Sequence, residues 1–223
     1  MTQPGEEFSV TVMAGGLALP GDLGIPEAAR GIVIFAHGSG SSRLSPRNRY
    51  VAAQLRQGGI GTLLFDLLTE EEDQDYERRF DIALLTQRLT GATRWLMATP
   101  WADGKGIGYF GASTGSAAAL LAAAELGPAI RAVVSRGGRP DMAVSGLPRV
   151  QAPTLLIVGG ADREVLALNQ RAFALLTTTK ELAVVPHATH LFEEPGTLEA
   201  VARLAREWFL RYLGDEKPSD PSP

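Results

Sequence analysis

The sequence contains no cysteine among its 223 residues. This absence excludes disulfides, thiolate metal ligands and a cysteine nucleophile, although it does not fix the cellular compartment. Histidine is also scarce: the chain has three, at positions 37, 187 and 190. Any site that needs an imidazole must therefore use one of these.

Long apolar runs and long basic runs are missing as well. The longest apolar stretch, around "AAALLAAA", is far shorter than the roughly 18 to 20 residues that span a bilayer. The net charge is −4, and Arg43, Arg47 and Arg49 form the only local basic cluster, which argues against nucleic-acid binding. The first ten residues lack a basic segment followed by an apolar one, as a secretory leader would have. We expect a cytoplasmic enzyme with no membrane or nucleic-acid partner.

What the sequence does contain is a regular alternation of short β-rich runs and longer helical segments. A hairpin is expected at 8–21, turning at Gly15 and Gly16, and buried strands at 31–38, 61–68, 106–110, 130–136, 153–160 and 180–187. Apolar strands separated by helices predict an α/β fold in which helices cover both faces of an eight-stranded, mostly parallel sheet. We expect one domain over 1–214 and a disordered, proline-rich tail over 215–223.

Helix boundaries carry their own signals. Ser45 and Pro46 predict the start of a helix that ends before Gly58, and a second helix is expected over 78–97 from its 3.6-residue apolar spacing. Between the strands that end near 136 and begin at 153 lie sixteen residues. This is enough for a short helix but not for a large cap domain.

Two motifs overlap in "GIGYFGASTGSAAALLA", residues 106–122. One is the G-x-G-x-x-G pattern of a dinucleotide cradle, and the other is G-x-S-x-G, which presents a serine nucleophile. The first two glycines fall inside the expected strand, whereas a cradle needs them in the turn. Ser113 stands between strand and helix among small neighbours, which favours the nucleophile; the alternative is an ordinary serine N-cap.

A serine nucleophile needs a base and an acid. In the chain order serine, acid, histidine, the base comes from His187 or His190, and His190 is favoured because it lies further beyond the strand end. Asp162 follows the strand at 153–160 and is the preferred acid, with Asp141 as the alternative. Asp66 precedes the serine and falls outside this order.

Acyl transfer also needs two amide donors for the oxyanion. Thr114, directly after the nucleophile, is expected to supply one backbone NH. Ser39, in "HGSGSS" after an earlier strand, is expected to supply the other. A phosphate-binding nest is the competing interpretation of "HGSGSS", but no P-loop lysine accompanies it.

The segments "HGSG", "GASTG", "GGADREV" and "HATHLFEEPG" occur in this order across nearly the whole chain. Together they resemble the α/β-hydrolase superfamily, and more closely its compact branch similar to dienelactone hydrolase. The resemblance implies Ser113 as nucleophile, Asp162 as acid, His190 as base, and the amides of Ser39 and Thr114 as the oxyanion hole. Dienelactone hydrolase itself has cysteine at the nucleophile position, so the serine here favours a general carboxylic-ester hydrolase.

These observations predict a serine esterase for small, short-acyl esters that needs neither metal nor cofactor. Arg43 and Arg136 are candidates for binding acidic substrates, and a homodimer is compatible with the sequence. Two alternatives remain: acyl transfer or perhydrolysis on the same triad, and a non-catalytic interaction protein on a hydrolase fold. The sequence does not identify the natural ester.

Overall fold

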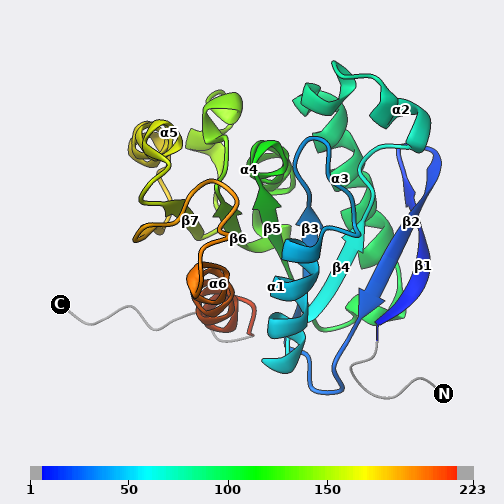
Figure 1. Ribbon diagram of the computed structural model, residues 1–223. Coiled ribbons are helices and arrows are strands. Elements are labelled where there is room, and N and C mark those ends of the chain that lie inside the picture. The colour runs from blue at the N-terminus through cyan, green and yellow to red at the C-terminus, as the bar shows by residue number, and fades with distance from the viewer. Residues whose placement is uncertain (1–6, 215–223) are drawn as a thin grey trace.

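The computed structural model, which describes residues 7–214, is built around an eight-stranded sheet with helices on both faces (Figure 1). The strands lie in the order β1-β2-β4-β3-β5-β6-β7-β8. Strands β1 and β2, and β2 and β4, pair antiparallel, and all other pairs are parallel. The predicted α/β-hydrolase architecture is confirmed. The strand bounds are β1 (Glu7–Ala14), β2 (Leu17–Gly24), β3 (Gly31–Ala36), β4 (Gly61–Phe65), β5 (Gly106–Ala112), β6 (Ile130–Arg136), β7 (Thr154–Gly159) and β8 (Lys180–Val185).

The helices divide between the two faces because the central strands are apolar on both sides. Helices α1 and α6 bury their apolar residues in one core layer, and α3, α4 and α5 pack into the other. Figure 1 shows α1 and α6 side by side on one face. The helix bounds are α1 (Pro46–Gln57), α2 (Glu70–Gln74), α3 (Ile82–Met97), α4 (Thr114–Leu126), α5 (Arg163–Leu175) and α6 (Thr197–Tyr212). None of the helices described in 7–214 is both long and apolar enough to cross a bilayer.

Local signals set the helix ends. The Ser45 side chain accepts a hydrogen bond from the Asn48 amide, α1 begins at Pro46, and Gly58 follows its end, as predicted. Helix α3 starts later than expected, at Ile82, because the Asp81 side chain caps it and residues 78–80 form a separate 3₁₀ turn.

One strand prediction needs correction. The segment 180–187 was expected to be buried, yet β8 is the last strand in the sheet and much of it is accessible; Val184 is 45% exposed. An edge strand has a strand neighbour on one side only.

The carboxyl ends of the parallel strands lie at the edge from which the loops with the predicted site residues emerge. Two 3₁₀ turns, Pro140–Ala143 and Leu147–Arg149, occupy the connection between β6 and β7. No large cap covers this edge in the part of the chain that the structure describes. The tail predicted to be disordered, 215–223, lies outside the described residues.

Candidate active site

Ser113 occupies a strained turn between β5 and α4. Its backbone has φ 51° and ψ −124°, a conformation that costs a non-glycine residue roughly 1 to 3 kcal/mol. Several hydrogen bonds enforce it: the Ser113 amide donates to Arg136 O at 3.2 Å, and Ser113 O accepts from the Ser116 hydroxyl at 2.7 Å and the Arg139 amide at 3.1 Å. The Ser113 side chain makes no capping hydrogen bond to α4, so the ordinary N-cap interpretation is wrong.

The glycines around Ser113 are required by contact with the backbone. A Cβ at Gly111 would lie 2.4 Å from Ser116 Cα, and one at Gly115 would lie 2.2 Å from Ala36 O. Gly106 and Gly108 lie within β5, where a Cβ on Gly108 would come 2.9 Å from the Phe209 ring of α6. These last two glycines serve packing against the end of α6, which agrees with the prediction that the dinucleotide pattern is accidental.

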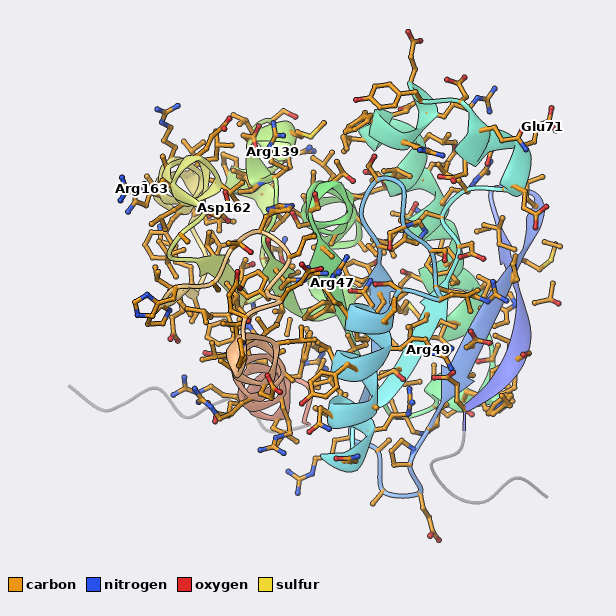
Figure 2. All side chains as sticks on the ribbon, viewed as in Figure 1. Arg47, Arg49, Glu71, Arg139, Asp162 and Arg163 are labelled. Carbon is orange, nitrogen blue, oxygen red and sulfur yellow. The ribbon has the colours of Figure 1, made fainter. Side chains whose placement is uncertain are left out.

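His190 and Asp162 are in direct contact. His190 Nδ1 lies 2.7 Å from Asp162 Oδ2, and their side chains are 37% and 15% exposed. Asp162 immediately precedes α5 but makes no capping hydrogen bond to it, so its carboxylate is available to the imidazole. Figure 2 labels Asp162 at the start of α5, at the carboxyl edge of the sheet.

The end of β6 lies beside both Ser113 and His190. Arg136 O accepts the Ser113 amide, and a Cβ on the next residue, Gly137, would lie 3.6 Å from His190 Cε1. The His190 ring therefore lies close to Gly137, the residue after the acceptor of the Ser113 amide. The three segments predicted to supply a nucleophile, an acid and a base meet at this point.

The alternative acid and base residues have other surroundings. The Asp141 carboxylate makes two hydrogen bonds to the Arg139 guanidinium, at 2.9 and 2.8 Å. His187 is exposed, in a turn with φ 61°. In residues 7–214, no group of three histidine, cysteine or acidic side chains is arranged to hold a metal ion.

The loop after β3 is fixed by His37, which sequence reasoning had set aside. His37 Nε2 accepts a hydrogen bond from the Leu67 amide at 3.0 Å, so Nδ1 carries the proton and donates to Gly38 O, also at 3.0 Å. Burial lowers the pKa of His37, which keeps the imidazole neutral. This histidine joins the loops that follow β3 and β4.

The two predicted oxyanion donors are in contact with each other. The Ser39 amide donates to the Thr114 hydroxyl at 2.9 Å, a contact that the sequence did not indicate. It ties the loop after β3 to the first turn of α4, close to Ser113: a Cβ on Gly38 would lie 3.7 Å from Ser113 Oγ. To hold an oxyanion, the Ser39 amide would have to exchange this acceptor for the substrate oxygen.

The two arginines proposed to bind substrate differ. The Arg43 guanidinium contacts Asp66 at 2.7 Å and Asp22 at 3.3 Å, so it joins β2 to the loop after β4. Arg136 is 6% exposed and donates from Nη2 to Asn48 Oδ1 at 3.1 Å. Desolvation first, and the charge of Arg47 second, lower the pKa of Arg136 to about 10.

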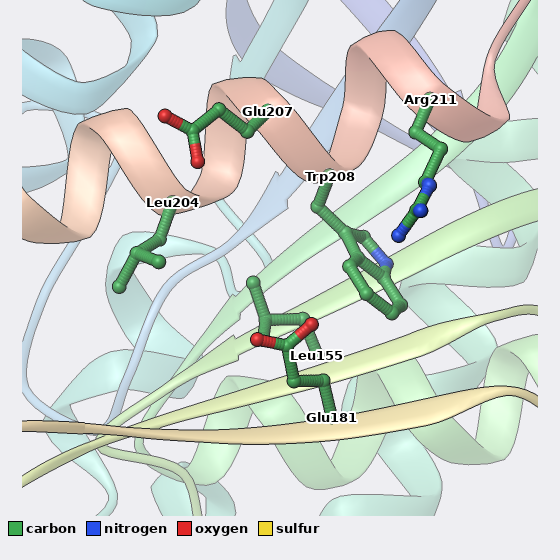
Figure 3. Close-up of a pocket in the computed structure, with 6 residues that line it drawn as sticks. All are labelled: Leu155, Glu181, Leu204, Glu207, Trp208 and Arg211. Atoms are coloured by element: carbon green, nitrogen blue, oxygen red, sulfur yellow. The ribbon is translucent and has the colours of Figure 1, made fainter.

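A groove elsewhere on the molecule lies between α6 and the strands β7 and β8 (Figure 3). Leu155 and Glu181 on its floor belong to the first halves of β7 and β8. The candidate acid and base follow the opposite ends of these strands. The groove is therefore separate from the site around Ser113.

Comparisons with known proteins agree with this architecture. The model of the Dienelactone hydrolase family matches residues 19–213. The crystal structure of a dienelactone hydrolase from Anabaena variabilis is 58% identical, with a TM-score of 0.91 over 95% of this chain and 100% of that one. An α/β serine hydrolase without lid from Xanthomonas campestris has a TM-score of 0.77 over 99% of this chain and 100% of its own, at 21% identity, which supports the fold alone.

Two curated proteins from strains of Mycobacterium tuberculosis are 57% identical over 216 residues. Both carry the name "Putative phosphoribosyl transferase". The match covers 97% of this chain and 49% of theirs, so the chain spans about half the length of these relatives.

Proposed function

Since the chain belongs to the dienelactone hydrolase family, we propose that it is a serine hydrolase that cleaves small carboxylic esters through an acyl-enzyme. The observation that carries this proposal is the 2.7 Å contact of His190 with Asp162 at the end of β6, beside the strained Ser113 turn.

In the proposed reaction, Ser113 Oγ attacks the ester carbonyl while neutral His190 takes its proton through Nε2. Asp162 accepts a hydrogen bond from Nδ1–H, which fixes this tautomer, and its carboxylate stabilises the imidazolium. The amides of Thr114 and Ser39 donate to the oxyanion. His190 then protonates the leaving alcohol, and water activated by the same histidine cleaves the acyl-enzyme.

The open carboxyl edge favours the proposal that the substrates are small. Only two 3₁₀ turns lie between β6 and β7, so little apolar wall is available to a long acyl chain. Each CH₂ that stays in water forgoes roughly 0.8 kcal/mol of burial. We propose that kcat/KM on nitrophenyl esters is highest for acyl groups of about two to six carbons.

The name of the Mycobacterium tuberculosis relatives suggests a different chemistry, which we do not propose for this chain. Gly106 and Gly108 face the end of α6 from within β5, so they are not available to cradle a phosphate. The match also covers about half of those proteins.

The test combines labelling with two matched pairs of variants. Ser113→Ala should abolish both ester hydrolysis and labelling by a serine-directed fluorophosphonate, whereas Ser116→Ala should still be labelled. Asp162→Asn should lower kcat by about a thousandfold or more because the wrong imidazole tautomer is favoured, whereas Asp141→Asn should remain near wild type. Labelling that maps to another serine, or full activity in Asp162→Asn, would refute the assignment.

The same assay separates the two remaining alternatives. Acyl transfer predicts that added alcohol or peroxide takes the acyl group from the acyl-enzyme, so that a new ester or a peracid forms in place of the carboxylic acid while phenol is still released. A non-catalytic protein would neither release phenol nor react with the phosphonate.

A further inference from the structure

The Thr114 hydroxyl is a buried polar group whose proton has no acceptor. Thr114 is 2% exposed, and within residues 7–214 its Oγ1 makes one hydrogen bond, in which it accepts from the Ser39 amide at 2.9 Å. A threonine hydroxyl can also donate, because it carries a proton as well as its lone pairs. This donor is left unused in the free protein, although buried polar groups are normally satisfied.

Most of the buried threonines in residues 7–214 use that proton inside the fold. The following donate it to a backbone carbonyl oxygen: Thr86, Thr90, Thr93, Thr154 and Thr197. Thr62 is the other buried threonine that only accepts, and its donor is the Arg56 guanidinium, a side chain with no part in the proposed reaction. Thr114 differs from all of these, because its hydroxyl is bonded to an amide that the proposed reaction needs.

The position of this hydroxyl connects it to the proposed reaction. Thr114 is the first residue of α4, directly after Ser113, at a helix end that favours negative charge. Its Oγ1 lies 2.9 Å from Ser39 N, and covalent geometry alone puts it roughly 2.8 to 3.7 Å from Thr114 N. The hydroxyl oxygen is therefore close to both amides proposed to bind the oxyanion. Ser113 and Ser39, which flank it, are only half-buried, so both remain open to a substrate.

The hydrogen bond between Ser39 and Thr114 occupies the donor that an oxyanion requires. A charged oxygen is a stronger acceptor than a neutral hydroxyl, so the Ser39 amide turns to the oxyanion when it forms. The Thr114 hydroxyl then loses its donor. An oxyanion bound to the same amide lies within a few ångström of Thr114 Oγ1, and the proton that has no acceptor in the free protein gains one.

Resting on the serine hydrolase function proposed above, we propose that the Thr114 hydroxyl is a third donor to the oxyanion. In the free enzyme it accepts from the Ser39 amide and holds that loop in place. In the transition state it donates to the oxyanion together with the amides of Ser39 and Thr114, and it transfers no proton. Because this bond strengthens as negative charge develops, it lowers the barrier to attack more than it strengthens ester binding.

The kinetic test compares Thr114→Val, which removes the hydroxyl with little change of shape, with Thr114→Ser, which keeps it. On nitrophenyl acetate we expect Thr114→Val to lower kcat/KM roughly 100-fold or more, and Thr114→Ser to retain most of it. Thr154→Val is the matched control, because Thr154 is fully buried at the start of β7 and its hydroxyl donates to Ala152 O. This control should lose stability, as measured by thermal melts, but keep its activity.

A pair of inhibitors separates oxyanion binding from substrate binding. Phenethyl trifluoromethyl ketone adds Ser113 Oγ to its carbonyl carbon, the serine proton passes to His190, and the former carbonyl oxygen carries the negative charge. Phenethyl methyl ketone has the same skeleton and stays a ketone. Thr114→Val should weaken binding of the trifluoromethyl ketone roughly 100-fold and leave binding of the methyl ketone unchanged. Thr114→Ser should bind both ketones much as the wild type does.

A crystal structure of the wild-type trifluoromethyl ketone adduct separates direct donation from support of the loop. Thr114 Oγ1 should lie about 2.7 Å from the adduct oxygen, and the Ser39 amide should donate to that same oxygen. A Ser39 amide that still donates to Thr114 Oγ1 in the adduct would overturn the proposal.

Three kinetic results would also overturn it. Unchanged kcat/KM in Thr114→Val would leave the hydroxyl without a role in turnover, and a higher kcat/KM would mean that it competes with the oxyanion for the Ser39 amide. An equal loss of affinity for the two ketones would mean that it only shapes the site. If the wild type neither cleaves esters nor reacts with the fluorophosphonate, the serine hydrolase function fails and this role fails with it, whereas an active wild type with an unaffected Thr114→Val refutes the role of the hydroxyl alone.

Discussion

The loops that follow β3 and β8 each place a histidine at the carboxyl edge of the sheet, but the two histidines have different surroundings. Both nitrogens of His37 are bonded to backbone groups, the Leu67 amide and Gly38 O, and the side chain is buried. His190 is 37% exposed, and its Nδ1 contacts the Asp162 carboxylate. The His37 imidazole links two loops through both of its nitrogens. Within residues 7–214, His190 Nε2 has no hydrogen-bond partner, as the proposed base requires.

This difference shows why residue type and edge position do not identify a base. A base must have a nitrogen that can receive a proton and a partner that stabilises the resulting cation. Both ring nitrogens of His37 are already hydrogen-bonded to the backbone, and burial disfavours the charged form of the ring. The salt bridge from Arg47 in α1 to Glu193 in the loop after β8 joins the two regions.

The largest expected effect is on the activity of His190→Ala. Loss of the proposed base should lower kcat by at least about ten-thousandfold, because a triad fails as a unit. Since His190 is part-exposed, the melting temperature should change little. Steady-state kinetics and thermal melts measure both quantities. His187→Ala, three residues away and exposed, is the control that should keep activity; the reverse pattern would assign the base to His187.

The strand positions and part of the candidate site could be predicted from the sequence. The apolar runs predicted the strand positions, and the order of Ser113, Asp162 and His190 predicted the contact that the structure forms between the last two. These features depend on local patterns and on the rule that parallel strands end at one edge.

Other features depend on three-dimensional neighbours that a sequence does not list. Arg43 meets Asp22 only because β2 pairs antiparallel with β4. The bond from the Ser39 amide to the Thr114 hydroxyl depends on the path of one loop and on one side-chain rotamer. The exposure of β8 follows from its place at the sheet edge. Helix α2 did have a local signal, the Thr69 and Glu72 capping box, which the sequence analysis missed.

An intermediate effect is expected where the loop after β3 packs against the turn between β5 and α4 that carries Ser113. In Gly115→Ala, the new Cβ would lie 2.2 Å from Ala36 O and 2.4 Å from His37 O, and backbone atoms cannot move aside easily. We expect a loss of roughly 2 to 3 kcal/mol in the free energy of unfolding together with reduced activity. Denaturant titration measures this loss.

The matched control for that variant lies in the loop after β8. Gly196 has φ 81° and no atom within 4 Å of its ideal Cβ, so Gly196→Ala should cost only about 1 kcal/mol of backbone strain. Equal losses in the two variants would mean that the loop after β3 is no more tightly packed than the loop after β8.

The smallest expected effect is the pH dependence of stability that His37 contributes. Burial holds the pKa of folded His37 below its ordinary value of 6.5. As the pH falls below about 6.5, the unfolded chain binds a proton at His37 that the folded protein resists, so the free energy of unfolding decreases. The slope from this one group is at most roughly 1.4 kcal/mol per pH unit.

His37→Gln keeps a hydrogen-bond donor and an acceptor but cannot titrate. Between pH 6.5 and 5, its stability should therefore fall less steeply than that of the wild type, as measured by urea titration at each pH. If the free energy of unfolding fell equally steeply with pH in both proteins, the His37 cation would be in contact with water in the folded protein. The assignment of His37 as a buried link between the two loops would then be wrong.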